Sequence, residues 1–216
     1  MRLPSLDERL HAAAELFTAC DVGADIGADH GRLSCYLLHQ RICRNMIVSD
    51  ISAESLSKAQ RLLSLHGLSG QAHFRVADGL DALKDTPVQC IAICGMGGRL
   101  MSDILIKGRQ MLCGADLVLS CHTEIPLIRE SICAIGYHLI HEKLVRAKGR
   151  YYVIMKATEG KGQYEDKELY LGPILMQERP PLWKPFLQWR DGVVSCEKNH
   201  KTQLQWIREE LEKCSS

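Results

Sequence analysis

Residues 21–38, DVGADIGADHGRLSCYLL, decide how the rest of the chain is organised. Residues 22–26 are short and apolar, as expected for a buried strand. A glycine-containing turn at 27–31 follows, and the next residues carry apolar side chains at helical spacing. Gly27 lets the backbone pass close to a ligand, next to the start of a helix. The stretch therefore predicts a cradle for a nucleotide-type cofactor, with the Asp25 carboxylate placed to hydrogen-bond a hydroxyl or ammonium group.

Strands and helices alternate through most of the sequence, which indicates an α/β fold with a mostly parallel sheet. Further strands are predicted at 45–49, 72–76, 88–94 and 116–120. A hairpin formed by 137–146 and 150–156 would then close the sheet with an antiparallel last strand. Before the first strand, residues 6–17 form an amphipathic pattern, so we expect a helix there. Ser5 would be its N-cap, and the helix would cover the sheet edge or the cofactor mouth.

The composition changes at residues 159–166, EGKGQYED, which have the character of a linker. We therefore divide the chain into a domain at 1–158 and a small helical domain at 159–216. From Trp183 to Leu211, apolar residues recur at intervals of three and four. This spacing predicts one long helix with a single apolar stripe.

Composition excludes several classes of protein. The chain has 216 residues, is 46% hydrophobic and carries a formal net charge of +1, so it has no polybasic arm. Its ten cysteines are scattered through apolar runs without a C-x-x-C pair, a pattern typical of free thiols in a reducing compartment. No segment is long and apolar enough to span a bilayer. We therefore expect a cytoplasmic protein without a membrane partner.

Four distinctive segments lie where predicted strands end, and strand ends meet at one edge of a parallel sheet. These segments are residues 25–31, Asp50, Asp78-Gly79 and the glycine turn 95–98. A nicotinamide cofactor favours G-x-G-x-x-G below a pyrophosphate, but this chain has Asp29 at the middle glycine position. A carboxylate there repels a pyrophosphate and suits S-adenosylmethionine, which carries a sulfonium and an ammonium group. Asp50 would accept the ribose hydroxyls, and Asp78 would lie by the adenine edge.

Three segments resemble one family, the bacterial tRNA (adenine-22-N1)-methyltransferases. They are ADIGADHGRL at 24–33, VADGL at 76–80 and ICGMGG at 93–98. The resemblance implies a Rossmann-like class I methyltransferase domain, followed by a helical, coiled-coil-like C-terminal domain. It also implies methyl transfer from S-adenosylmethionine to N1 of an adenine in tRNA. The chain departs from the family after the fifth strand, where Ser120-Cys121-His122 stands in place of Gln-Pro, and its C-terminal part is shorter.

The same resemblance assigns the cofactor site residue by residue. It puts the cofactor on Asp25, Gly27, Asp29, His30, Asp50, Asp78, Gly79, Gly95 and Met96. The adjoining Gly31, Ile51 and Gly97 complete the predicted cofactor-binding set.

The chemistry predicted for this site needs no general base. The turn at 95–98 has no amide, carboxylate or aromatic side chain to grip an exocyclic amine. Adenine N1 already carries a free lone pair, so the main demand is alignment and exclusion of water. Asp29 is the candidate catalytic residue, because it could hydrogen-bond the adenine amino group or stabilise the cation that forms. A purely cofactor-binding role for Asp29 remains the alternative.

Candidate tRNA-binding residues are basic side chains near the site and on the hairpin. They are Arg9, Arg99, Arg146, Lys148 and Arg150. The alternative is that they form an ordinary solvated face.

Two other patterns have a functional and a structural interpretation. His122-x-Glu124 imitates a zinc deaminase motif, but no Pro-Cys-x-x-Cys follows it, so no metal is expected. Trp183, Trp189 and Trp206 fit a base-stacking platform, yet their helical spacing favours packing.

The sequence thus predicts an S-adenosylmethionine-dependent tRNA adenine-N1 methyltransferase, acting as a monomer or weak dimer. One alternative is a methyltransferase for a small molecule, which the near-neutral charge would suit. The other is a non-catalytic cofactor-binding module that recruits a partner through its C-terminal helix.

Overall fold

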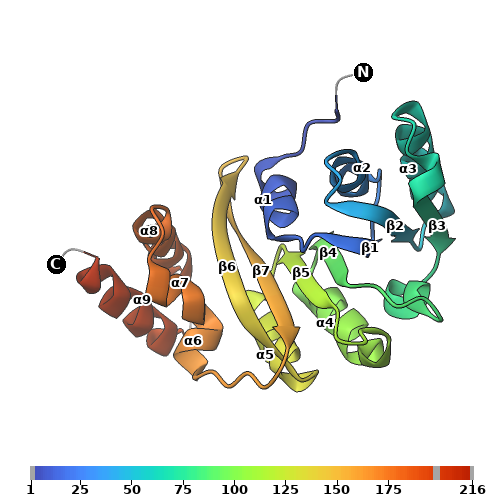
Figure 1. The fold of residues 1–216 in the computed structure, drawn as a ribbon. Coiled ribbons are helices and arrows are strands. Elements are labelled where there is room, and N and C mark those ends of the chain that lie inside the picture. The colour runs from blue at the N-terminus through green and yellow to red at the C-terminus, as the bar shows by residue number, and fades with distance from the viewer. Residues whose placement is uncertain (1–2, 197–199, 215–216) are drawn as a thin grey trace.

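The computed structural model describes residues 3–196 and 200–214, and its centre is a seven-stranded sheet (Figure 1). The strand order is β3-β2-β1-β4-β5-β7-β6. The strands are β1 (Cys20–Ile26), β2 (Cys43–Asp50), β3 (Ala72–Val76), β4 (Cys90–Met96), β5 (Asp116–Cys121), β6 (Tyr137–Ala147) and β7 (Arg150–Glu159). β1 to β5 run parallel, whereas β7 is antiparallel to both β5 and β6. The predicted α/β fold, its strands and its closing hairpin are confirmed.

Helices cover both faces of the sheet; one precedes the first strand, and four follow parallel strands. They are α1 (Glu8–Leu16), α2 (Arg32–His39), α3 (Ala53–Leu65), α4 (Gly98–Lys107) and α5 (Ile125–Ala134). Short 3-10 helices lie at η1 (Ser69–Gln71), η2 (Gly79–Leu83) and η3 (Arg109–Met111). After β7 come α6 (Asp166–Leu171), α7 (Pro173–Glu178), α8 (Trp183–Ser195) and α9 (Lys201–Lys213), which lie beyond the β6 edge of the sheet (Figure 1).

The apolar residues of the strands divide into two layers because successive side chains point to opposite faces. Met46 and Val48 pack in the layer that holds α1, α2 and α3. Ile47, between them, packs in the layer that holds α4 and α5. Leu187 of α8 and Ile207 of α9 belong to this second layer. The C-terminal helices therefore extend the core of the sheet.

The first helix begins two residues later than predicted. The side chain of Asp7 accepts a hydrogen bond from the backbone N–H of Leu10, so Asp7 is the N-cap and the assignment of Ser5 was wrong. Asp7 also accepts a hydrogen bond from the side chain of Arg9, at 2.6 Å. This second contact fixes Arg9, which the sequence had named as a candidate site residue.

The prediction of one long C-terminal helix was wrong. α8 and α9 pack against each other as a helical hairpin, and Arg208 Nε donates to Asp191 Oδ1 at 3.0 Å. In one continuous helix these two residues would lie about 25 Å apart. Residues 197–199, within the predicted helix, lie outside the described residues.

A buried ion pair attaches the C-terminal helices to the sheet. Arg129 of α5 donates from Nε to Glu142 Oε1 of β6 at 2.8 Å, and both side chains are almost fully buried. Arg129 Nη1 also donates to the carbonyl oxygens of Leu169 and Tyr170. Glu142 Oε2 accepts from the backbone N–H of Ile174 at 3.0 Å, at the start of α7. The pair thus connects α5, β6, α6 and α7.

Glu142→Ala is expected to lower the free energy of unfolding by about 3 to 5 kcal/mol, because Arg129 would stay buried without its partner. Urea unfolding followed by circular dichroism measures the change. Glu54→Ala is the matched control, since it removes an exposed ion pair with Lys58 and should leave the midpoint close to that of the wild type. A wild-type midpoint for Glu142→Ala would contradict the attachment role.

Candidate functional site

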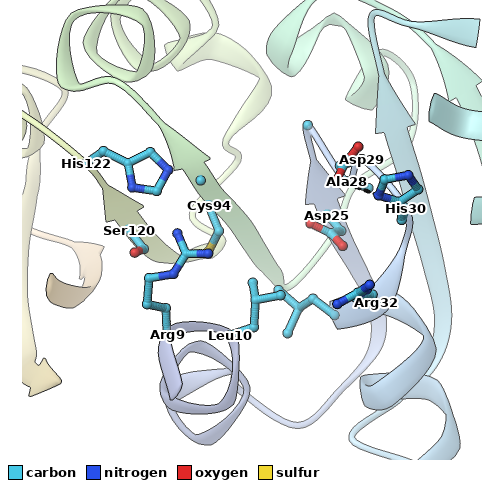
Figure 2. Close-up of a pocket in the computed structure, with 13 residues that line it drawn as sticks. Arg9, Leu10, Asp25, Ala28, Asp29, His30, Arg32, Cys94, Ser120 and His122 are labelled. Carbon is cyan, nitrogen blue, oxygen red and sulfur yellow. Dashed lines mark hydrogen bonds and ion pairs between the residues drawn. The ribbon is translucent and has the colours of Figure 1, made fainter. Parts of the chain in front are cut away.

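A cavity of about 250 Å³ opens at the carboxyl ends of β1, β4 and β5. Figure 2 shows Asp25, Asp29 and His30 along one wall, and Cys94, Ser120 and His122 along the other. Arg9 and Leu10 of α1 also line the cavity, so α1 covers its mouth, one of the two positions expected for this helix. The structure therefore brings together six of the predicted site residues: Arg9, Asp25, Gly27, Asp29, His30 and Gly95.

Asp25 is the buried acid of this cavity, with only 3% of its surface exposed. Ser34 of α2 donates a hydrogen bond from Oγ to Asp25 Oδ2 at 2.6 Å. Burial raises the pKa of the Asp25 carboxyl to about 6; the Ser34 hydrogen bond opposes the shift and the charge of Asp50 adds to it. A carboxylate held at such a desolvated position is suited to a cationic ligand.

The turn after β1 uses its two glycines for close packing. Gly27 has φ +70°, and a Cβ there would lie 2.9 Å from the Met96 side chain. Gly31 has φ +66°, and its Cβ would lie 2.7 Å from the Cβ of Ala59 on α3. Gly31 thus lets α2 approach α3, and it does not line the cavity.

Asp50 supports the rim of the cavity without lining it. Its Oδ2 accepts from the backbone N–H of Asp29 at 3.0 Å, and its Oδ1 accepts from that of Ser52 at 2.8 Å. Each carboxylate oxygen keeps a free lone pair for a ligand hydroxyl. Ile51, directly after it, is 71% exposed.

Asp29 and His30 form a pair on the exposed side of the same wall. His30 Nδ1 lies 2.8 Å from Asp29 Oδ2. Asp29 has φ +49°, a left-handed conformation in which Asn and Asp are tolerated better than most residues. The turn thus holds the Asp29 carboxylate at the cavity, where the sequence had expected it.

The glycine turn after β4 contains one open and one crowded position. At Gly95, with φ +84°, nothing lies within 4 Å of the place that a Cβ would take. At Gly98, a Cβ would lie 2.4 Å from the carbonyl oxygen of Thr123. Gly95 therefore leaves space beside the cavity, whereas Gly98 allows the turn to contact the loop after β5. Met96 and Gly97 lie between them and do not line the cavity.

Several predicted residues lie elsewhere. Asp78 and Gly79 line a separate cavity of about 140 Å³ against α4, so they are not part of the first one. Arg99 is exposed and pairs with Glu124 at 3.2 Å. Lys148 and Arg150 are exposed at the turn of the β6–β7 hairpin. Asp78 as an adenine contact stays a prediction.

The sequence interpretation did not name seven residues of the cavity wall as site residues. Three of them are Leu10, Ala28 and Leu33, and the four that carry a nitrogen, oxygen or sulfur atom in the side chain are Arg32, Cys94, Ser120 and His122. Ser120 is 2% exposed, and its Oγ has no hydrogen-bond partner. The ring of His122 lies 5.8 Å from that of Tyr152, and the Arg9 guanidinium lies 5.0 Å from the same Tyr152 ring. Applying the strand-end rule to the fifth strand would have identified Ser120 and His122. Within the described residues, no cluster of three His, Cys, Asp or Glu could hold a metal ion.

Comparison with known proteins agrees with this architecture. Residues 6–155 match the family model described as a methyltransferase domain. The tRNA (adenine(22)-N(1))-methyltransferase of Bacillus subtilis is 32% identical over 181 residues, which cover 81% of this chain and 76% of that protein. The crystal structure of the B. subtilis M1A22 tRNA methyltransferase TrmK has a TM-score of 0.78 at 26% identity, covering 98% of this chain and 96% of that chain.

A second solved structure supports the fold. A Streptococcus pneumoniae protein, solved in complex with S-adenosyl-L-methionine, has a TM-score of 0.90 at 24% identity and covers 96% of this chain and 100% of that chain.

The sheet order, the antiparallel β7 and the cavity at the strand ends define a Rossmann-like methyltransferase fold. The sequence identity to the B. subtilis protein, and the share of both chains that the match covers, identify the family within this class. The chain belongs to the tRNA (adenine(22)-N(1))-methyltransferase family, as its sequence motifs had indicated. Within the described ranges, no helix has the length and apolar character needed to cross a membrane.

Asp25→Asn is expected to stabilise the ligand-free protein increasingly as the pH rises. Because the folded-state pKa is raised, the Asp25 contribution to stability is present at low pH and is lost as the pH rises toward about 6. The difference in unfolding free energy between variant and wild type should grow by roughly 1 to 2 kcal/mol between pH 5 and pH 7.

Urea titrations at several pH values measure this difference. Asp21→Asn, at an exposed position of the same strand, is the matched control and should show no such growth. A pH-independent difference for Asp25→Asn would mean that the carboxyl is not desolvated.

Proposed function

We propose that this protein transfers a methyl group from S-adenosylmethionine to N1 of an adenine in tRNA, the adenine at position 22. The proposal rests on one observation. The buried Asp25 carboxylate lines the same cavity as Gly95, and the space that a Cβ of Gly95 would take is open. The B. subtilis relative is named for this reaction. The proposal includes a monomer or weak dimer as the working form and the cytoplasm as its location.

The residues of the cavity fit this cofactor. Asp25 offers a desolvated carboxylate for a cationic group, and Asp50 keeps lone pairs for ribose hydroxyls. The buried Ser120 hydroxyl lacks a partner and so remains able to bond a ligand. Asp29 stands where a dinucleotide fold places a glycine beneath a pyrophosphate. A sulfonium cofactor is therefore favoured over a nicotinamide dinucleotide.

The protein's own task in this reaction is alignment. When bound, S-adenosylmethionine supplies an electrophilic methyl group. Adenine N1 needs no proton removed, so the residues must hold it in line and exclude water. The open side of Gly95 lets a flat base approach, and Asp29 can hydrogen-bond the adenine amino group or offset the positive charge that methylation creates.

The test of the function is incubation of the purified chain with labelled S-adenosylmethionine and unmodified tRNA, followed by nucleoside analysis. We expect 1-methyladenosine. A tRNA with guanine in place of adenine 22 is the matched substrate control and should receive no label. Label on small molecules alone would favour a small-molecule methyltransferase, and cofactor binding without any transfer would favour a non-catalytic module.

Asp29→Asn is expected to lower kcat on the order of 10-fold or more while the affinity for S-adenosylmethionine changes little, because the charge acts on the base. Asn keeps the left-handed conformation of residue 29, so the turn should persist. Steady-state kinetics and calorimetry measure the two quantities separately. Equal losses in both would make Asp29 a cofactor-binding residue only.

Affinity for tRNA should fall steeply with salt concentration if the hairpin contacts phosphates. Lys148→Asn with Arg150→Gln removes two exposed cations at the hairpin turn, and Asn suits the φ of +48° at position 148. The slope of log affinity against log salt should become shallower by roughly 1 to 2. Lys58→Gln, on α3 near the opposite edge of the sheet, is the control. A flat salt response of the wild type would count against RNA binding.

A further inference from the structure

A second cavity, of about 210 Å³, lies next to the first. It is formed where α8 packs over β7 and the loop after β5. His122 lines both cavities, so the two share a wall residue. A ligand that spans the two cavities would pass this histidine.

Three aromatic rings form one wall of the second cavity. The ring centroids of Tyr151 and Trp189 are 5.5 Å apart, those of Tyr151 and Phe186 are 5.7 Å apart, and those of Phe186 and Trp189 are 6.1 Å apart. Trp183, on the same helix, is only 1% exposed and serves packing, but Trp189 is 39% exposed. The cluster thus presents one large ring to solvent at the edge of the cavity.

Guanidinium groups flank these rings. Arg146 lies over the Tyr151 ring at 5.6 Å from its centroid, across the β6–β7 pair. Arg190, which lines the cavity, lies 4.9 Å from the centroid of Tyr170. Arg129 also lines the cavity, but its charge is paired with Glu142. Aromatic faces with arginines beside them are the combination that binds unpaired bases and their phosphates.

We propose that this second cavity binds the base of a nucleotide next to the target adenine, stacked on Trp189. The proposal rests on the proposed function and adds a substrate subsite to it. The position favours an RNA base over a separate partner, because the two cavities share His122 and a ligand that fills the first can extend into the second. Neighbouring nucleotides of one strand form such an extended ligand. Stacking accepts any base, and Arg146 and Arg190 would neutralise the phosphates on either side.

The variants that test this subsite are Trp189→Ala, Trp189→Phe and Val193→Ala. Val193 follows one turn later on α8, is 38% exposed and does not line the cavity, so it is the matched control. Trp189→Ala should raise KM for tRNA on the order of 10-fold, with little change in the affinity for S-adenosylmethionine. Trp189→Phe should restore most of the loss, and Val193→Ala should behave as the wild type.

Tryptophan fluorescence gives a direct second readout. Addition of tRNA should quench the wild-type emission, and Trp189→Phe should lose that quenching while it still methylates tRNA. If the wild type methylates tRNA but Trp189→Ala keeps the wild-type KM, the subsite is wrong and the proposed function stands. If the wild type does not methylate tRNA, the proposed function fails first. A Trp189→Ala protein with lowered melting temperature and weakened cofactor binding would show a structural role and overturn the subsite.

Discussion

The buried ion pair between Arg129 and Glu142 is the interaction on which the arrangement of the molecule depends. It joins the last crossover helix, the edge strand and the first C-terminal helices at one desolvated point. A buried ion pair needs further hydrogen bonds to offset its desolvation, and here Arg129 Nε and Nη1 and both Glu142 carboxylate oxygens have partners. The pair therefore fixes where the C-terminal helices leave the sheet. That position in turn brings α8 over β7 and creates the second cavity.

The first cavity contains a buried carboxyl group, that of Asp25, whose surroundings differ from those of the Arg129–Glu142 pair. Ser34 hydrogen-bonds Asp25 through its hydroxyl and its backbone, and within the described part of the chain Asp25 forms no ion pair. Burial raises the pKa of the Asp25 carboxyl, so its ionised form is disfavoured. The core on both faces of the sheet and the paired charges at its edge offset this local instability. A ligand with a positive group relieves it, so binding free energy comes from a site that the fold holds in an unfavourable state.

Features set by local sequence could be predicted, and those set by distant contacts could not. Apolar runs and glycine positions were enough to predict residues 22–26 of the first strand, observed at Cys20–Ile26, and the turn at Lys148. The break between α8 and α9 leaves only a small mark on the three-four spacing, one pair of successive four-residue intervals at Cys196, His200 and Leu204. Two helices that face the same core keep the rest of the apolar stripe unchanged. The partners Arg129 and Glu142 lie on different elements, and no spacing rule connects them. Asp78 follows the end of β3, yet it lines a different cavity, together with residues of α4.

The three tryptophans show why helical spacing alone does not decide between packing and binding. Periodicity places residues on one helix face, but whether a ring is covered depends on the elements that pack there. Trp183 meets the core and is buried, and Trp206 lies against Tyr170. The Trp189 ring lies against the rings of Tyr151 and Phe186 but stays 39% exposed, at the edge of the second cavity. Helix α8 therefore anchors the C-terminal part through the buried Trp183. About one and a half turns later, the same helix leaves the Trp189 ring exposed in the cavity that His122 also lines, near the carboxyl end of β5.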